Sequence, residues 1–391
     1  MINPRPVLAA GCTTPAPQGA DIGTLAAADG CNPLFRNRWT ADPAPLTVGD
    51  RMYIYAGHDN GEDNFRIDEW VAYSTTDMRT WTDHGAFMKP TDFAWSTGEA
   101  WASEMVEKDG KFYFYTTVQH QKPHGGKAIG VAVGDSPLGP FTDARRSALV
   151  LDNKDTWRTW SEIDPTVLVD DDGSAYIAWG NSNLYLAKLK PNMIELDGPP
   201  QELQLTNYLE GPWLHKRGDL YYLTYASIKE PEQKNERISY ATAPSMAGPW
   251  TYRGELTGEA ENSFTIHAGI EQFKGDWYFI YHNGLLTIDG KPGSQFRRSV
   301  AAERITYDEN GLMRPITQTR QGVRRRASYN LPRRRLSSTP PATIASVSAP
   351  ANPAAAARWS GRRNPPLTCP SSAGGVNRLP DVAAAGSAFA K

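Results

Sequence analysis

The chain has 391 residues, of which 40% are hydrophobic and 10% aromatic, so it can bury the core of one large domain or of two average ones. Residues 324–391 carry 11 Lys and Arg against a single acid, which leaves 30 Lys and Arg against 42 Asp and Glu in residues 1–323. The acidic main part argues against nucleic acid as the main partner, because phosphate binding needs a basic surface. The sequence has no run of 18 apolar residues, so no transmembrane helix is predicted.

The N-terminal residues resemble a bacterial export signal. Leu8–Cys12 has the pattern of a lipoprotein cleavage box and is followed by a Thr-, Pro- and Gln-rich segment, but the basic and apolar regions of a complete signal are missing. We expect a truncated signal and a secreted, periplasmic or lipid-anchored protein, with the cytoplasm as the alternative. Cys12, Cys31 and Cys369 are too few and too widely spaced for a disulfide framework or a zinc site, and we expect isolated thiols.

Five copies of one hairpin pattern follow along the chain. Each copy begins with an acid or a histidine, continues as an apolar strand, turns at a Gly–Asp or Asp–Gly pair and ends in an aromatic strand, which is a strong hairpin signal. The copies are Asp42–Tyr55, Glu104–Tyr115, Asp164–Tyr176, Glu210–Leu223 and His267–Ile280. Their second strands share a leading tyrosine: Tyr53, Tyr113, Tyr176, Tyr221 and Tyr278.

The repeat predicts an all-β fold, a five-bladed β-propeller. Five units of about 45–60 residues with about four strands each are typical of this architecture. We expect the propeller to span residues 32–322, preceded by a short N-terminal segment, residues 1–31. Residues 323–391 are rich in Ala, Pro and Arg and show no periodicity, so we expect a disordered basic tail.

The phase of the repeat predicts a shared site. Asp42, Glu210 and His267 each lie 11 residues before the leading tyrosine of their unit, and Asp164 lies 12 before its own. The same position in the second unit is Ala102. Since the first strand of each blade runs along the central axis of a propeller, we expect these side chains to meet at one mouth of the channel.

Converging carboxylates suit glycoside hydrolysis. One carboxylic acid protonates the leaving oxygen, a carboxylate on the opposite face activates water or attacks the sugar, and a third can raise the pKa of the acid. A single Asp before Pro more often caps a turn or pairs with a surface lysine. Three acids in the same phase favour the catalytic interpretation.

At these residues the chain resembles glycoside hydrolase family 43, over Asn32 to Gly322. The resemblance rests on four motifs in order: Ala41-Asp42-Pro43, Ile163-Asp164-Pro165-Thr166, Glu210-Gly211-Pro212 and Phe296-Arg297-Arg298-Ser299-Val300. It implies a five-bladed propeller and an enzyme that inverts the anomeric centre. It also implies that Asp42 is the general base, Glu210 the general acid, and Asp164 the residue that tunes and orients the acid.

The resemblance implies further roles. His267 is expected to hold a metal ion, calcium or a similar one, with waters supplying most of the oxygen ligands; a core histidine is the alternative. Arg298 is expected to bind the sugar, since a guanidinium offers five donors, with a solvated charge as the alternative. Trp101 can stack on a sugar face or pack in the core, and His58 is a candidate for the pocket rim.

Three functions remain open from the sequence. The first is an exo-acting β-xylosidase or α-L-arabinofuranosidase that releases xylose or arabinose from xylan- or arabinan-derived oligo- or polysaccharides. The second is an endo-acting arabinanase, which needs an open groove. The third is a non-catalytic sugar-binding propeller, for which an intact set of three acids is unnecessary. No organic cofactor is expected, and the sequence does not indicate an oligomeric state.

Overall fold

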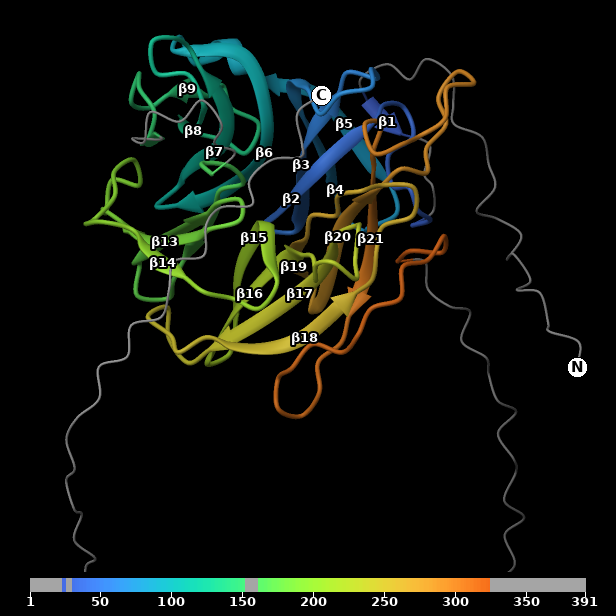
Figure 1. Cartoon of the computed structure of the whole chain (residues 1–391). Coiled ribbons are helices and arrows are strands. Elements are labelled where there is room, and N and C mark those ends of the chain that lie inside the picture. Colours follow the sequence, from blue (N-terminus) through green and yellow to red (C-terminus); the bar gives the residue numbers. More distant parts are fainter. Residues whose placement is uncertain (1–22, 26–29, 152–160, 324–391) are drawn as a thin grey trace, which may run out of the picture. The chain divides into compact units, whose positions relative to one another are not determined.

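The computed structural model describes residues 23–25, 30–151 and 161–323 (Figure 1). The predicted N-terminal segment, except for a few residues, and the predicted basic tail, except for Val323, lie outside the described residues. The described part consists almost wholly of antiparallel strands, with one short 3-10 helix, η1 (Pro90–Asp92). Within it, no helix is long and apolar enough to cross a membrane.

Five consecutive groups of strands make up the described part, and we call them blades one to five. Blade one contains β2 (Thr40–Val48), β3 (Arg51–Asp59), β4 (Ile67–Thr75) and β5 (Trp81–Met88), and β1 (Gly23–Leu25) pairs with β5. Blade two contains β6 (Ser96–Lys108), β7 (Lys111–His120), β8 (Lys127–Gly134), β9 (Thr142–Asp143) and β10 (Val150–Leu151). A single pairing of β4 with β6 joins these two blades into one sheet.

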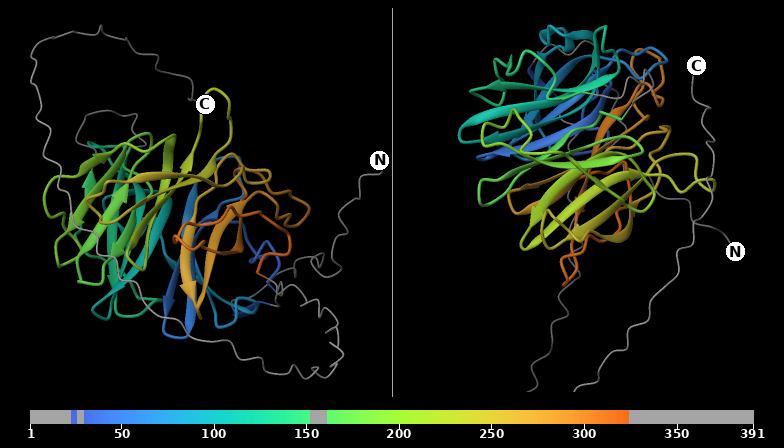
Figure 2. Two further views of the ribbon diagram at one scale, coloured as in Figure 1. Left: turned by 90° about the horizontal axis from the view of Figure 1, so that it is seen from below. Right: turned by 60° about the vertical axis from the view of Figure 1, so that its left-hand side comes forward.

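The remaining blades are separate sheets. Blade three contains β11 (Thr166–Val169), β12 (Ala175–Trp179), β13 (Leu184–Leu189) and β14 (Gln201–Leu203). Blade four contains β15 (Tyr208–Arg217), β16 (Leu220–Ser227), β17 (Arg237–Ala243) and β18 (Thr251–Thr257), and blade five contains β19 (Gly269–Phe273), β20 (Asp276–Asn283) and β21 (Ser299–Ile305). In Figure 2 the green strands of blade three lie beside the yellow-green strands of blade four, in agreement with the contacts of β11 and β12 with β15.

The first strands of the five blades form a closed ring. β2 contacts β6, β6 contacts β11, β11 contacts β15, β15 contacts β19, and β19 returns to β2. Each leading tyrosine lies in the second strand of its blade, as the repeat requires. The predicted five-bladed β-propeller is therefore confirmed.

Blade five has three strands, so the expectation of about four strands in every unit is wrong there. In place of a fourth strand, two short segments from opposite ends of the propeller lie against β21. Leu34 N donates to Val300 O at 2.8 Å, Ala302 N donates to the Asn32 side chain at 2.9 Å, and Val323 N donates to Gly30 O at 3.0 Å. The first two bonds satisfy the edge of β21, and the third joins the two segments to each other.

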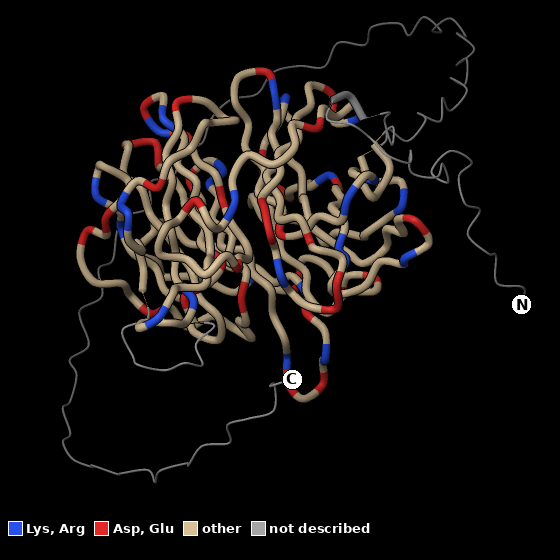
Figure 3. Tube along the Cα trace, turned by 90° about the horizontal axis from the view of Figure 1, so that it is seen from above, with Lys and Arg blue, Asp and Glu red and all other residues tan. Residues whose placement is uncertain are grey.

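Large aromatic side chains fill the space between blades. Trp70, Trp81, Trp179, Tyr115 and Tyr225 are among the fully buried residues, and such rings bury more apolar surface than any other side chain. Charged residues of both signs are interspersed along the loops that surround this core (Figure 3).

Cys31 contradicts the expectation of isolated thiols. It is fully buried and disulfide-bonded, and its partner lies outside the described residues. Pairing depends on which cysteines meet in space, and three widely spaced positions in a sequence carry no information on that.

Candidate active site

Distorted backbone aims the acidic side chains at the central axis. Asp42 (φ 51°) and Asp164 (φ 57°) adopt the left-handed conformation, which is uncommon for residues other than glycine, and each precedes a proline. Register shifts interrupt the β2–β3 pairing after Ala41 and the β15–β16 pairing on both sides of Glu210. A bulge of this kind re-aims one side chain of a strand, so each acid leaves its sheet and points inward.

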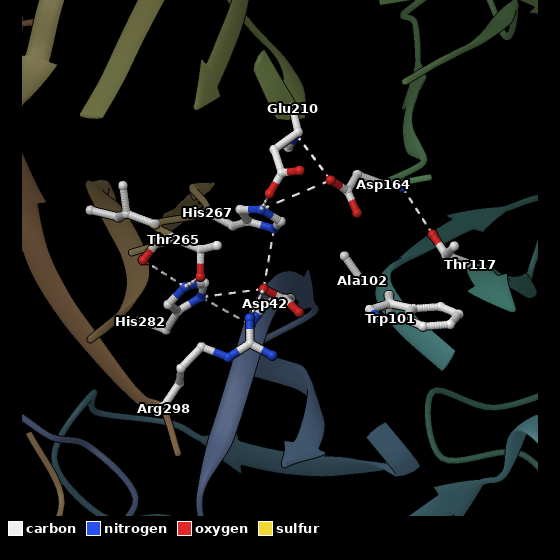
Figure 4. A network of polar contacts seen from close by, with 12 residues as sticks. Asp42, Trp101, Ala102, Thr117, Asp164, Glu210, Thr265, His267, His282 and Arg298 are labelled. Carbon is white, nitrogen blue, oxygen red and sulfur yellow. Dashed lines mark hydrogen bonds and ion pairs between the residues drawn. The ribbon is translucent and has the colours of Figure 1, made fainter. Parts of the chain in front are cut away.

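His267 lies at the centre of the three carboxylates (Figure 4). Its Nδ1 lies 3.2 Å from Asp42 Oδ1, and its Nε2 lies 3.1 Å from Glu210 Oε1 and 3.9 Å from Asp164 Oδ2. Burial disfavours a charged ring, but the surrounding carboxylates outweigh burial and raise the pKa of His267 well above its ordinary value. The charged form of the ring is therefore favoured: its Nε2 is hydrogen-bonded to Glu210, and on its Nδ1 side the ring forms an ion pair with Asp42.

Arg298 also contacts the Asp42 carboxylate. Its Nη1 lies 3.1 Å from Asp42 Oδ1, while Nη2 and Nε donate to the two oxygens of Asp59 at 2.8 and 3.1 Å. All three side chains are buried. Such a two-pronged contact fixes the plane of a guanidinium, so Asp59 determines where Arg298 can reach.

His282 supports Asp42 as a neutral ring. Its Nδ1 accepts from the Asp42 backbone N–H at 3.2 Å, and its Nε2 lies 3.0 Å from the Thr265 carbonyl. Burial, together with the positive charges of Arg298 and His267, lowers the pKa of His282 well below its ordinary value. The tautomer that carries the proton on Nε2 satisfies both contacts.

Asp164 and Glu210 lie next to each other, so the charge of one affects the pKa of the other. Asp164 Oδ2 accepts from Gly211 N at 3.1 Å, and Asp164 N donates to Thr117 at 2.9 Å. Burial raises the pKa of Asp164 to about 7; the charge of His267 opposes this shift, while the charges of Glu210 and Asp42 add to it. The pair can therefore keep one proton close to neutral pH.

Glu210 is held in place by several donors. Asn181 Nδ2 lies 2.5 Å from its Oε2, and His267 donates to Oε1. Burial would raise the pKa of Glu210, but these hydrogen bonds outweigh burial and lower it. Gly211 follows at φ 56°, where an added Cβ would lie 2.9 Å from the His267 ring, so only glycine allows this close approach.

Comparison with known proteins matches this arrangement to one family. The family model of the glycosyl hydrolases of family 43 matches residues 31–313. The chain belongs to glycoside hydrolase family 43. The resemblance stated from the sequence is confirmed, and the chain is a glycoside hydrolase.

Family 43 relatives cover most of the chain. The xylosidase/arabinosidase 43A of Humicola insolens is 29% identical over 71% of this chain and 97% of its own length. A GH43 β-xylosidase/α-arabinofuranosidase from a compost microbial metagenome, solved in complex with xylotriose in a calcium-free form, has a TM-score of 0.64 at 25% identity, over 73% of this chain and 97% of its own. The GH43_1 enzyme from Xanthomonas citri complexed with xylose has a TM-score of 0.63 at 27% identity, over 72% and 92%.

The structure brings most of the predicted residues of this family 43 site together. Asp42, Asp164, Glu210 and His267 meet at the axis, and Arg298 joins them through Asp42.

Trp101 and His58 lie in different surroundings. Trp101 is partly buried beside Ala102, on the side of the site that faces Asp42 and Asp164 (Figure 4). Lys127 Nζ lies 3.5 Å from the centre of its indole ring, so one ring face already has a partner. His58 pairs through Nδ1 with Glu69 at 3.0 Å. Neighbouring residues of a strand point to opposite faces, and it is Asp59 that turns toward the site.

Three residues of the site were missed from the sequence: Asp59, Asn181 and His282. For His282 a signal existed, because it lies four residues after the leading tyrosine of blade five. Thr117 holds the same position in blade two. Each of these two side chains accepts from the backbone N–H of the aspartate that opens the next blade. The repeat thus encodes the support of Asp42 and Asp164 as well as the acids themselves.

A metal ion has a candidate position within the same cluster. Asp164, Glu210 and His267 each offer one ligand atom, and these atoms lie within 4.8 Å of one another. Two carboxylates and an imidazole are a chemically suitable donor set. In the present arrangement His267 Nε2 is hydrogen-bonded to Glu210 and Nδ1 faces Asp42, so a metal bound to this ring would take the place of one of these contacts.

Proposed function

We propose that this family 43 member is an inverting, exo-acting glycosidase that releases xylose, arabinose or both from hemicellulose oligosaccharides. The observation that carries the proposal is the convergence of Asp42, Asp164 and Glu210 on one buried histidine. An isolated capping residue needs no such convergence, and a sugar-binding module needs no coupled pair of carboxyls.

The roles of the two carboxylates that contact His267 are those that membership of family 43 implies. Asp42 acts as the general base that activates water, and Glu210 acts as the general acid that protonates the leaving oxygen. The contacts of 3.2 and 3.1 Å lie on the two nitrogens of one imidazole ring, so the width of that ring separates the two carboxylates. Such a separation leaves room for an attacking water, for which inverting enzymes use about 6.5–9.5 Å between the carboxyls.

Asp164 holds the proton that the general acid Glu210 needs. A general acid must be protonated when the bond breaks, yet the free site favours an ionised Glu210. Because Asp164 keeps its proton to a pH of about 7, the pair holds a proton that Glu210 can carry once the leaving oxygen displaces one of its donors. Asp164 is then left charged and stabilises the protonated acid.

The sugar preference is proposed from the names of the relatives and from two side chains of the site, Arg298 and Trp101. The relatives are named as xylosidases and arabinosidases, and two similar structures were solved with xylotriose and with xylose. Arg298 can donate to ring hydroxyls beside Asp42, and Trp101 can stack on the sugar.

Product analysis tests the activity. Nitrophenyl β-xyloside, nitrophenyl α-L-arabinofuranoside, xylobiose and linear arabinan are each incubated with the protein, and the released sugars are separated and quantified. Monosaccharide release supports the exo-acting proposal. Long arabino-oligosaccharides would point to an endo-arabinanase, and no product from any substrate would favour a binding protein.

The stereochemistry is tested separately. Proton NMR during the first minutes of xylobiose hydrolysis shows which anomer forms before mutarotation. We expect α-xylose first, and an initial excess of β-xylose would contradict inversion.

We also propose that His267 takes part in holding a calcium ion, with waters as most of its ligands. When bound, such an ion would supply positive charge between the carboxylates, as the imidazolium does here. Calorimetric titration of chelator-treated protein with CaCl₂ tests this. Saturable binding that His267→Ala abolishes supports the proposal, and heat of dilution alone speaks against it.

Export remains a proposal as well. The lipoprotein-like Leu8–Cys12 and the disulfide at Cys31 support it, since disulfides persist mainly outside the cytosol. Fractionation of bacteria that express the full chain, with mass spectrometry of the N-terminus, tests it. An unprocessed chain confined to the cytosol would contradict it.

A further inference from the structure

A large pocket lies between blades four and five, outside the catalytic centre. Its volume is about 1010 Å³, and its walls come mainly from residues 257–264 between β18 and β19, from Ser294 and Gln295 between β20 and β21, and from residues 316–318 after β21. No residue of the catalytic centre is among the described residues that line it. Small-molecule pockets of proteins measure about 300–1,000 Å³, so this pocket is large enough for a short oligosaccharide.

The pocket lies on the same face of the propeller as the catalytic centre. Because neighbouring strands of a blade are antiparallel, the β18–β19 and β20–β21 connections both cross the face on which the first strands begin. The residues that meet at the axis lie at the beginnings of those first strands. The wall segment 257–264 also continues to His267 within three residues. A ligand in the pocket is therefore held beside the segment that carries His267.

The charges of the pocket are balanced. Glu259 and Glu261 are the acids among its lining residues, and the described lining contains no lysine or arginine. Glu259 pairs with Arg237 at 3.1 Å, and Glu261 pairs with Arg320 at 3.0 Å. An anionic ligand needs cationic groups in the lining, and a hard metal ion needs carboxylates that arginine does not already neutralise. A neutral ligand fits this surface best.

Amide side chains give the pocket unused hydrogen-bonding capacity. Asn262 Nδ2 donates to two backbone carbonyls at 2.7 and 2.8 Å, and Gln318 Nε2 donates to Gly258 O at 2.9 Å. These bonds fix both side chains to the walls, while their amide oxygens accept no hydrogen bond within the described part of the chain. Gln295 makes no side-chain hydrogen bond there either. Such amides suit the hydroxyls of a sugar, which both donate and accept.

Phe264 adds an aromatic surface to the pocket. Its side chain is partly exposed and belongs to none of the hydrophobic clusters formed by the described residues. Its backbone is fixed, since Phe264 O accepts from Glu236 N at 3.0 Å. Ligand pockets typically combine aromatic side chains with a few polar groups. Phe264 and the amides give this pocket both kinds of contact that a sugar ring needs.

We propose that this pocket is a second carbohydrate-binding site, which holds a neutral part of the hemicellulose chain while another part of that chain occupies the catalytic centre. The choice of hemicellulose rests on the proposed function, whereas the neutral, polyhydroxylated character of the ligand follows from the pocket itself. Two linked contacts bind a long chain more tightly than either contact alone. The pocket therefore favours polymers over single sugar rings.

Affinity electrophoresis tests the second site directly. The full chain with Glu210→Gln, which should cut the polymer too slowly to matter, is run on native gels with increasing soluble arabinoxylan or linear arabinan. We expect at least one polysaccharide to retard it. Adding Gln295→Ala or Phe264→Ala should raise the apparent dissociation constant at least about fivefold, because one of two linked contacts is lost. Gln201→Ala, at an exposed glutamine of blade three, is the matched control and should change nothing.

Kinetics of the active enzyme give a second readout. Arabinoxylan can reach both sites, whereas nitrophenyl β-xyloside is too small to do so. The ratio of kcat/KM on arabinoxylan to kcat/KM on nitrophenyl β-xyloside should fall about fivefold in Gln295→Ala. The same ratio should stay at the parental value in Gln201→Ala. A change confined to the polymer is not expected from a general loss of stability.

The possible outcomes separate this site from the proposed function. The second site is overturned if neither polysaccharide retards the protein, or if Gln295→Ala behaves like Gln201→Ala. If Phe264→Ala does not fold, Gln295→Ala decides alone, since its partly exposed side chain makes no bond in the described part of the chain. A parent protein that binds through the pocket but cleaves none of the substrates would support the second site and contradict the proposed function.

Discussion

Individual charges in this site depend on neighbours that belong to other blades. Three surrounding carboxylates raise the pKa of His267 and favour its charged form. Burial, with the nearby charges of Arg298 and His267, lowers the pKa of His282, whose ring centroid lies 5.5 Å from that of His267, and favours its neutral form. Two histidines of the same blade thus carry different charges, and each state suits the contacts of Asp42.

At the residue scale, replacement of Glu210 tests the acid role. Glu210→Gln should lower kcat on xylobiose by more than about 10³-fold, because the leaving oxygen can no longer be protonated. The loss on nitrophenyl glycosides should be at least tenfold smaller, since nitrophenolate leaves without protonation. Steady-state kinetics on both substrates measures the difference. An equal loss on both would contradict a general acid at this position.

Glu104 predicts a pH dependence of stability. Burial raises its pKa to about 8, although hydrogen bonds from Thr166 and Val167 N oppose the shift. Between pH 4.5 and 8 the folded chain keeps a proton that the unfolded chain releases, so this residue lowers the free energy of unfolding as the pH rises.

The Glu104→Gln variant removes that dependence. Its free energy of unfolding relative to the parent should increase by roughly 3 kcal/mol between pH 5 and pH 8. Urea unfolding at both pH values measures the change, with the exposed Glu309→Gln as a control that should show none. A constant difference between variant and parent would show that Glu104 is ionised in the folded protein.

At the element scale, the three-stranded blade five shows how the ring is closed. β21 is covered by short segments from the beginning and the end of the propeller instead of by a fourth strand. Asn32 is the main contact: its amide donates to Ala302 O, Glu303 and Thr319 O at 2.8–3.2 Å and accepts from Ala302 N. One buried side chain thus joins both segments to the last strand.

Asn32→Ala should therefore weaken closure of the ring. Loss of these bonds leaves buried backbone groups unpaired, and we expect the free energy of unfolding to fall by about 2 kcal/mol. Thermal and urea unfolding measure it, with the exposed Asn310→Ala as control. Equal stability of the two variants would mean that closure does not depend on Asn32.

At the scale of the whole molecule, the last described contact of the closure is made by Val323, whose N–H donates to Gly30 O. A chain that ends after Val323 keeps every hydrogen bond described above. We expect deletion of residues 324–391 to change the melting temperature by less than about 2 °C and to leave kcat on nitrophenyl β-xyloside unchanged. Calorimetry and kinetics of the shortened chain check this, and a large fall in melting temperature would show that the tail packs on the propeller.

The fold and the residues that open each blade could be predicted from the amino-acid sequence alone. The strand period, the turn residues and the spacing from each leading tyrosine are local properties of the sequence. Because five repeats close into a ring, residues at the same position of each repeat lie close together in space. For this reason the positions of Asp42, Asp164, Glu210 and His267 could be predicted, and so could that of Ala102, which takes the same repeat position in blade two.

The three-dimensional structure was needed to find the remaining supports of these four side chains and to assign their charges. Asp59 lies at a strand end and Asn181 in a loop, where no repeat fixes direction, and each makes its contact with a different segment. The disulfide of Cys31 and the missing fourth strand of blade five likewise depend on distant parts of the chain. Contacts between blades set the burial and the neighbouring charges, and these quantities, not residue type, control pKa and hydrogen bonding.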